Sequence, residues 1–344
     1  MTSLLADPWL ARQVRFEYLN TTPGEEKRPG AVDLSNLRRA LAHGWAIFRK
    51  ARHVDVVHLN LAPAPLLPLL RALFLAVAAK VGGSRVVLHA HTGRLHHYTG
   101  RRSYRFVLGI TLRVVDAFIV VSGAAEEAVR DVGPNVVRLA NGLDPWGFQT
   151  GPKTENPPTL LFVGTVCERK GLLDLRDALG QVMERNGNPR PLAAQIVGDG
   201  TQEGPGVFDR VRAAYERAGL DWVDFTGALR QDQVKEILSR ASIFCLPSHW
   251  EGFPISMLEA MASQTAIIAT RVGDIPEMLG QGTAGILVDP RDPSALADAI
   301  ERLLSHREER ETLGRNARVR VEEEYDQSRL VQSLLAIYAG GAGR

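Results

Sequence analysis

Short apolar runs alternate with helical segments along almost the whole chain, and this alternation limits the possible folds more than any other feature. About eleven runs have strand character: VRFEYLN (14–20), VDVVHLNL (54–61), RVVLHAH (85–91), DAFIVVS (116–122), VVRLANG (136–142), TLLFVGT (159–165), LAAQIVGDG (192–200), DWVDFTG (221–227), SIFCLPS (242–248), TAIIATR (265–271) and AGILVDP (284–290). Helical patterns such as 33–51, 171–185 and 294–305 lie between them. Apolar strands separated by helices indicate parallel sheets covered on both faces.

Eleven strands are more than one doubly wound sheet usually holds, and a polar, proline-rich stretch, GPKTENPPT, interrupts the series at residues 151–159. Such a stretch is typical of a linker. We therefore predict two Rossmann-like, doubly wound α/β domains, the first covering residues 1–150 and the second beginning at residue 151. Because ligands of such sheets bind at the carboxyl ends of the strands, a cleft between two facing sheets is the expected site.

Charge is distributed unevenly between the two predicted domains. Residues 1–150 contain 19 Lys and Arg against 11 Asp and Glu, a net charge of +8, and the remainder contains 22 against 28, or −6. A basic N-terminal domain indicates either a surface that faces lipid headgroups or phosphates, or an ordinary solvated surface. The two cysteines, Cys167 and Cys245, lie in apolar runs and suggest no disulfide framework. Three prolines and Arg71 interrupt the most hydrophobic stretch, residues 61–80, so we expect a buried or half-buried helix in a soluble protein.

The segment EGFPISMLEAMA (251–262) contains the clearest chemical signal. Pro254 suits the first turn of a helix, and the backbone donors around Gly252, Phe253 and Ile255 then point out of its positive end, where anionic or hydroxyl oxygens bind. Glu259 stands among apolar neighbours, where a carboxylate is costly unless donors satisfy it. A ribose diol supplies two such donors, whereas a neighbouring Arg or a backbone cap is the structural alternative.

The segment GTVCERKG (164–171) adds cations between a strand end and a helix start. Arg169 and Lys170 suit a diphosphate, since lysine offers a point charge and arginine a fork of donors. The pattern is not a P-loop. VGDG, at 197–200, is common turn chemistry and is weak by itself.

From about residue 85 to 338 the chain resembles glycosyltransferase family 4, the retaining enzymes with the GT-B fold. The E-x7-E pair of EGFPISMLEAMA is that family's most specific motif. FVGTVCERKG, VGDG, VDFTGAL, ILSRASIFCLPS, TRVGDIPEML, GILVDP and the earlier DAFIVVS and NGLD match the family pattern in order and spacing. Several motifs in the same order are much stronger evidence for the resemblance than any one motif.

The resemblance implies a retaining glycosyltransferase that takes a UDP-, GDP- or ADP-sugar as donor, with no required cofactor or metal. Glu259 is expected on the ribose hydroxyls, Glu251 and the amides after Gly252 on the donor sugar, and Lys170 with Arg169 on the diphosphate. His91 is expected near the reacting carbon and is, with Glu251, a candidate catalytic residue. The remaining candidate donor-binding residues are Thr165, Gly198, Gly227, Phe253, Pro254 and Ile255. The second domain then ends at residue 325, and residues 326–344 form a helix that crosses back to the first domain.

Two departures from the family pattern stand out. Thr165 occupies the position where the family usually has an arginine, and we expect Arg169 to supply the missing guanidinium. The family also opens with an apolar strand and a Gly-Gly loop, but here LLADPWLARQ (4–13) already has helical character and VRFEYLN resembles the second strand. We expect either that this start is internal to a longer natural protein, or that the chain is unstable and poorly active.

Three alternative functions remain open. His89 and His91 form a His-x-His pair at a strand end, which is also a ligand arrangement of metal-dependent hydrolases. Thr165 and the missing strand fit a sugar-nucleotide-binding protein without transfer activity. A GT-B epimerase is possible on fold grounds, although the E-x7-E spacing disfavours it.

The sequence constrains the identity of the acceptor substrate less than that of the donor. RRSYRFVLGITLR (101–113) mixes arginine with apolar residues, and a helix of this kind either rests on an anionic bilayer or packs with a charged outer face. We expect a glycan or lipid-linked acceptor in cell-surface polysaccharide or glycolipid synthesis. No nucleic-acid partner is expected. The predicted location is cytoplasmic, with peripheral contact at the inner face of the plasma membrane.

Overall fold

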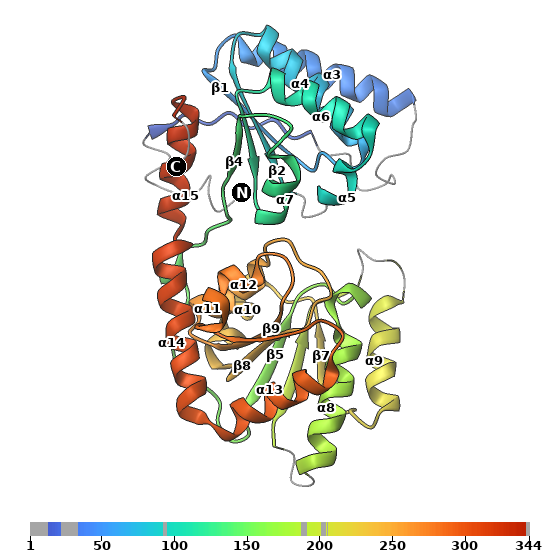
Figure 1. Ribbon diagram of the computed structural model, residues 1–344, viewed down its shortest axis with the longest axis vertical. Coiled ribbons are helices and arrows are strands. Elements are labelled where there is room, and N and C mark those ends of the chain that lie inside the picture. Colours follow the sequence, from blue (N-terminus) through green and yellow to red (C-terminus); the bar gives the residue numbers. More distant parts are fainter. Residues whose placement is uncertain are drawn as a thin grey trace. The chain divides into compact units, whose positions relative to one another are not determined.

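The computed structural model describes residues 13–21, 34–91, 95–186, 191–200, 204 and 206–341. The chain divides into two compact units (Figure 1). Unit 1 is Met1–Ala140 with Ser328–Arg344, and unit 2 is Asn141–Gln327. The division falls after Ala140, before the predicted boundary at residue 150. Each unit is built on one sheet of parallel strands, so the predicted α/β class with two parallel sheets is confirmed.

The sheet of unit 1 has four described strands in the spatial order β1-β2-β3-β4, all parallel. They are β1 (Val56–Leu61), β2 (Arg85–Ala90), β3 (Ala117–Val120) and β4 (Val136–Arg138). The helices of this unit are α3 (Leu34–Ala51), α4 (Leu66–Val81), α5 (His96–Thr99), α6 (Arg102–Val114), α7 (Gly123–Val129) and α15 (Gln327–Tyr338).

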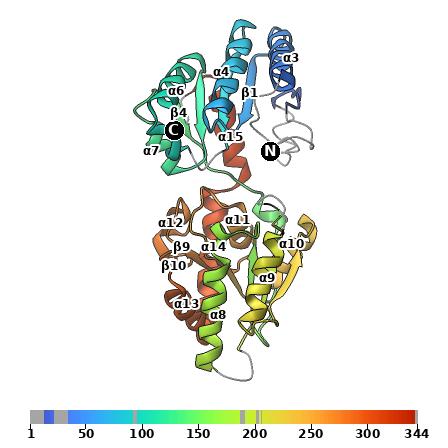
Figure 2. The same cartoon turned by 90° about the vertical axis from the view of Figure 1, so that its right-hand side faces the viewer.

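Helices cover both faces of this sheet (Figure 1, Figure 2). Alternate residues of β2 divide between the faces, as the two-residue period of a strand requires. Val86 and Leu88 enter the larger core, which α4 and α6 close. Val87 packs on the other face against Leu334 and Ile337 of α15. The last helix of the chain is therefore an integral layer of unit 1.

The predicted strand at residues 14–20 is wrong. Residues 14–21 have no regular structure and are largely exposed. Side chains hold this segment to helices instead of a sheet edge: Lys50 of α3 lies 2.5 Å from the Glu17 carboxylate, and Arg71 of α4 donates to the Thr21 carbonyl at 2.7 Å. The alternating sequence pattern could not show that the described residues of this segment join no sheet. The predicted helix at 4–13 lies outside the described residues except for its last position.

The sheet of unit 2 has six parallel strands in the order β10-β9-β8-β5-β6-β7. They are β5 (Thr159–Val163), β6 (Ala193–Val197), β7 (Asp224–Gly227), β8 (Ile243–Leu246), β9 (Ala266–Thr270) and β10 (Ile286–Val288). The chain order reverses between β5 and β8, which are neighbours. In open parallel sheets ligands bind at such a reversal, outside the carboxyl ends of the strands.

Two sets of contacting helices accompany this sheet, α8 with α9 and α13, and α11 with α10 and α14. The helices of the unit are α8 (Leu172–Asn186), α9 (Val207–Arg217), α10 (Gln231–Arg240), α11 (Ile255–Ala262), α12 (Ile275–Met278), α13 (Pro293–Ser305) and α14 (Arg307–Glu324), with the short turns η1 (Pro145–Gly147), η2 (Glu168–Lys170) and η4 (Gly280–Gly282).

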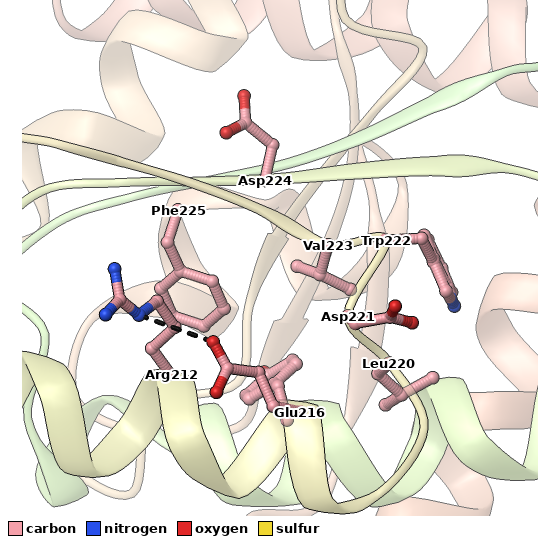
Figure 3. Close-up of a pocket in the computed structure, with 9 residues that line it drawn as sticks. Arg212, Glu216, Leu220, Asp221, Trp222, Val223, Asp224 and Phe225 are labelled. Atoms are coloured by element: carbon pink, nitrogen blue, oxygen red, sulfur yellow. Dashed lines mark ion pairs between the residues drawn. The ribbon is translucent and has the colours of Figure 1, made fainter.

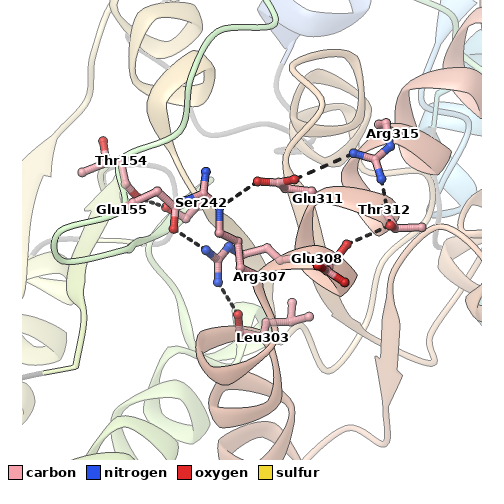
Figure 4. Close-up of polar contacts among 10 residues, drawn as sticks. Thr154, Glu155, Ser242, Leu303, Arg307, Glu308, Glu311, Thr312 and Arg315 are labelled. Atoms are coloured by element: carbon pink, nitrogen blue, oxygen red, sulfur yellow. Dashed lines mark hydrogen bonds and ion pairs between the residues drawn. The ribbon is translucent and has the colours of Figure 1, made fainter.

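Polar contacts fasten the predicted linker to α14 (Figure 4). The buried guanidinium of Arg310 bonds the Glu155 carboxylate and the Leu303 carbonyl. The Ser242 hydroxyl, at the start of β8, bonds the Thr154 carbonyl. The segment 151–159 is thus part of unit 2 and is held by one charge-assisted bond, from Arg310, and one neutral bond, from Ser242. Charge-assisted bonds are the stronger kind.

Candidate functional site

Two loops leave the sheet of unit 2 where the strand order reverses. One follows β5 and ends in η2, and the other follows β8 and leads into α11. They touch through their backbones, since the His249 amide donates to the Arg169 carbonyl at 2.8 Å. Gly171 adopts a φ of +67°, and a Cβ there would lie 1.9 Å from the Pro247 carbonyl oxygen. Only glycine permits this approach of the two loops.

The approach joins Lys170 to Glu251. Lys170 Nζ lies 2.5 Å from Glu251 Oε1, and both residues are buried. The Ser248 hydroxyl donates to the same carboxylate oxygen at 2.7 Å. A buried carboxylate is costly without such partners, so the two predicted site residues depend on each other. Because an ammonium group has three N–H donors, Lys170 has two more to offer.

Arg169 extends this cluster on the side of Trp250. Its Nη1 lies 3.6 Å from Glu251 Oε2 and 3.3 Å from the Trp250 carbonyl oxygen. Its guanidinium lies 5.5 Å from the centre of the Trp250 ring, within the range of a cation–π contact. The Arg169 Nε is buried and has no hydrogen-bond partner among the described residues. Two cations and one carboxylate therefore meet here, with one positive charge in excess.

Helix α11 begins beside this cluster. Pro254 is its N-cap residue with φ −76°, one position before the predicted first turn. In the described part of the chain, no acceptor bonds the backbone N–H groups of Gly252, Phe253 or Ile255. The Gly252 carbonyl instead accepts from the Asp274 amide at 3.2 Å, which fixes the turn. Free donors at a helix start attract anionic or hydroxyl oxygens.

Glu259 lies in the second turn of α11 and is half-buried. Both neighbours in sequence, Leu258 and Ala260, are fully buried. Among the described residues no donor bonds its carboxylate, so neither the Arg partner nor the cap of the structural alternative is present. Burial raises the pKa of this carboxyl, and the charge of Lys235 opposes that rise.

The other predicted donor-site residues sit at strand ends of the same sheet. Gly198 follows β6 with a φ of +134°, and a Cβ there would lie 1.9 Å from the Gly164 carbonyl oxygen. Gly227 ends β7, and its carbonyl accepts from the Gly198 amide at 2.9 Å. Thr165 is half-buried in the loop after β5. Phe253 is buried against Tyr325, with ring centroids 5.5 Å apart, and Ile255 is 43% exposed.

Substituting Gly171 by alanine should destabilise unit 2 more than the same change at Gly227. Both glycines have positive φ, +67° and +72°, but Gly227 has open space where its Cβ would be. We expect Gly227→Ala to cost about 1 kcal/mol, the usual penalty for a left-handed conformation. Gly171→Ala should cost roughly 1–2 kcal/mol more, because the loops must also separate. Urea unfolding of both variants measures this difference, and equal midpoints would contradict the close approach.

His91 belongs to unit 1, where it follows β2 and is exposed. His89 is buried two positions earlier, and the two ring centroids lie 4.0 Å apart. Within the described residues no group of three or more His, Cys, Asp or Glu could hold a metal ion. The hydrolase alternative therefore lacks a ligand set in the part of the chain that the structure describes.

Sequence reasoning missed three residues around Lys170 and Glu251. Ser248 is fully buried, and its position at a strand end three residues before Glu251 was a usable signal. Trp250 underlies Arg169, and His249 Nε2 lies 2.6 Å from Asp174 Oδ2 of α8. Nothing in the sequence indicated that His249 pairs with Asp174, because the two residues are far apart in the chain.

A separate cavity lies between α9 and the amino end of β7 (Figure 3). Its lining includes Leu220, Trp222 and Asp224, with an ion pair of 3.5 Å between Arg212 Nε and Glu216 Oε1. Gly227 stands at the opposite, carboxyl end of β7. The cavity is therefore not part of the cluster around Lys170 and Glu251.

Family comparisons match both units. The model described as glycosyl transferases group 1 matches residues 148–320, half of the chain, and the model described as glycosyltransferase family 4 matches residues 9–146.

Alpha-maltose-1-phosphate synthase of Mycobacterium tuberculosis is 31% identical over 252 residues, which are 65% of this chain and 62% of that protein. The chain thus spans less than two thirds of that relative. Phosphatidyl-myo-inositol mannosyltransferase of the same organism is 28% identical over 328 residues, 92% of this chain and 79% of that protein.

Among solved structures, the Anabaena protein HepE in complex with UDP and glucose superposes with a TM-score of 0.71 at 19% identity, covering 89% of this chain and 83% of that one. At this identity the likeness establishes the fold, and it confirms the GT-B architecture predicted from the sequence.

Proposed function

The chain belongs to the glycosyl transferases group 1 family, and from that premise we propose that it transfers a sugar, with retention, from a nucleotide-diphosphate sugar to a glycan or lipid-linked acceptor. The observation that carries this proposal is the buried Lys170–Glu251 ion pair, with Arg169 and the start of α11 beside it, at the strand reversal of unit 2. An excess of positive charge and free helix-end donors suits a diphosphate.

Each part of the donor has a matching group in unit 2. Lys170 keeps two N–H donors beyond its bond to Glu251, and Arg169 keeps its unpaired Nε, so both can serve the diphosphate. Glu259, whose carboxylate no described donor bonds, would accept from the ribose hydroxyls. Glu251 and the free amides from Gly252 would hold the donor sugar. The presence of UDP and glucose in the HepE complex supports a donor of this class.

The same groups would assist the transfer step. As the bond between sugar and diphosphate breaks, negative charge grows on the leaving phosphate oxygen. Lys170, Arg169 and the start of α11 would stabilise that charge in fixed positions, which is the most effective form of electrostatic catalysis. We propose that the acceptor hydroxyl attacks the sugar carbon from the face that the diphosphate leaves, and that its proton passes to the leaving phosphate oxygen. We also propose that His91 acts near the reacting carbon and that this positive charge serves without a metal.

The acceptor would bind unit 1. A relative that matches 92% of this chain is named for phosphatidyl-myo-inositol. Helix α6 supports a contact with anionic lipid. Arg101 and Arg102 are exposed and Phe106 is 71% exposed, while Arg105 is paired with Asp131. Among the described residues no helix is both long and apolar enough to cross a bilayer. We propose a cytoplasmic protein with peripheral membrane contact through α6.

Co-sedimentation with phosphatidylglycerol vesicles tests this membrane contact. The double substitution Arg101→Gln and Arg102→Gln should abolish the co-sedimentation.

A donor panel tests the transferase proposal. Calorimetry with UDP-, GDP- and ADP-sugars should identify one donor that binds unit 2, and mass spectrometry should then detect its sugar on an added glycan or lipid acceptor. Binding without transfer or hydrolysis would favour a sugar-nucleotide-binding protein. Absence of binding by every nucleotide sugar would overturn the proposal.

Thr165 occupies the position where the family usually has an arginine, and we expect Arg169 to supply that guanidinium instead. Arg169→Ala should weaken binding of the preferred nucleotide diphosphate about tenfold, which corresponds to one charge-assisted hydrogen bond. Arg212→Ala, an exposed arginine on α9, is the matched control and should change nothing. If Arg169→Ala leaves the affinity for the nucleotide diphosphate unchanged and Thr165→Arg raises activity, Arg169 does not supply the missing guanidinium.

A further inference from the structure

Four aromatic side chains of unit 1 form a continuous column on the face of the sheet that α15 covers. The Tyr338 hydroxyl of α15 lies 2.6 Å from Nδ1 of His58 on β1. The His58 ring lies 5.3 Å, between centroids, from the ring of His89 on β2, and the His89 ring lies 4.0 Å from that of His91. The column therefore leads from the last helix of the chain to the candidate catalytic histidine.

The column is costly for the fold. The Nε2 atoms of His58 and His89 are buried without a hydrogen-bond partner among the described residues. Asn60, paired in register with His89, has a third such atom in Oδ1. Burying a polar group without a hydrogen-bond partner lowers the stability of the fold. Val87 and Ile119 on the same face are apolar and pack in the core that α15 closes. An apolar side chain at position 89 would therefore serve stability better than histidine.

The interior members of the column are uncharged near pH 7. Burial, with a smaller contribution from the charge of His91, lowers the pKa of His58 to about 4. Burial, then the charges of His91 and His58, lowers the pKa of His89 to about 2. Burial raises the pKa of Tyr338 to about 12, so its hydroxyl keeps its proton. The column places no charge beside His91, and its effect is one of position.

We propose that Tyr338, His58 and His89 are positioning residues for His91. The bond from Tyr338 fixes the ring of His58, His58 confines His89 within the sheet face, and His89 gives the exposed His91 ring a rigid surface to lie against. An exposed side chain otherwise samples several rotamers, which would weaken any group that must meet a reacting atom. The catalytic consequence rests on the proposed function, whereas the column itself does not.

The test combines two conservative variants with a double-mutant cycle in the full chain. Tyr338→Phe keeps the ring of α15 and removes only the hydroxyl, and it should lower kcat about fivefold, the equivalent of one ordinary hydrogen bond, with the donor KM unchanged. In a His91→Ala background the same change should have no further effect, because Tyr338 acts through His91. His89→Ala should lower kcat at least as much, and His89→Phe, which restores a ring, should recover most of the loss.

A second readout does not depend on activity. In histidine-labelled protein, Tyr338→Phe and His89→Ala should shift and broaden the NMR ring signals of His91, while Tyr18→Phe, at a tyrosine 69% exposed, should leave them in place. Unchanged NMR signals of His91 would contradict the proposed positioning role of Tyr338 and His89. Equal losses of kcat with and without His91 would contradict it as well. If the wild-type protein transfers no sugar, the proposed function is wrong. The NMR result would still show whether the column positions the His91 ring.

Discussion

Replacing Glu259 by alanine should weaken binding of the preferred nucleotide sugar by at least about 100-fold. Two hydrogen bonds from ribose hydroxyls to one carboxylate would be lost, and bonds to charged groups contribute about 1.5–3 kcal/mol each. The fold should not suffer, because no described donor bonds this carboxylate, and its removal relieves a half-buried charge. Calorimetric Kd values and urea unfolding of the same samples separate the two effects.

The matched control for this change is Glu236→Ala, an exposed glutamate on α10 that pairs with Arg240 at 3.0 Å. It should leave donor affinity as it is. A structural role for Glu259 predicts the reverse pattern, a loss of stability with donor binding retained. That outcome would remove the proposed ribose contact of Glu259 from the transferase proposal.

The same carboxyl should make donor binding dependent on pH. Burial raises the pKa of Glu259 above its usual value. Since the carboxylate form accepts the ribose bonds, affinity should fall as pH decreases through that raised pKa. Stability should change in the opposite direction, because a folded-state pKa above the unfolded one gives a contribution that is present at low pH and lost as pH rises through the folded value. Glu259→Ala should remove both dependences.

Replacing Lys170 by methionine should have the largest effect on stability. Glu251 is 7% exposed and would keep the Ser248 hydroxyl and the longer ion pair of 3.6 Å with Arg169. Removing one partner of a buried ion pair costs about 3–5 kcal/mol, because the other charge stays buried without its nearest partner. Adding Glu251→Gln to Lys170→Met should recover part of this loss. Differential scanning calorimetry and urea unfolding of both single variants and the double variant measure the coupling.

Lys170→Met should also slow transfer by about 100- to 1000-fold under conditions where the variant is folded, the usual effect of losing one group that stabilises transition-state charge. Arg302→Met is the control for the stability effect, since the Arg302–Glu309 pair is exposed on the arginine side at 59%. Exposed pairs contribute about 0–1 kcal/mol. A loss for Lys170→Met as small as that of the control would contradict the buried-pair account.

Much of the fold could be read from the sequence. Continuous apolar runs such as SIFCLPS have the length and composition of buried parallel strands, and β8 is fully buried as that pattern requires. The helices also lie where the apolar period changes; the pattern at 294–305 corresponds to α13, Pro293–Ser305. The segment 14–20 has an alternating pattern that is also typical of a strand, yet none of its residues joins a sheet in the part of the chain that the structure describes. A sequence pattern cannot reveal whether a neighbouring backbone is free.

The candidate site divides in the same way. The sequence by itself determined the candidate residues: a carboxylate among apolar neighbours at Glu259, and a lysine at the end of a strand at Lys170. Only the tertiary structure decided that Lys170 bonds Glu251, 81 positions away, and that Tyr338 meets His58 across 280 positions. The physical reason is that residue type and local period fix what each segment can bury or bind, whereas the order of strands in the sheet decides which strand ends become neighbours.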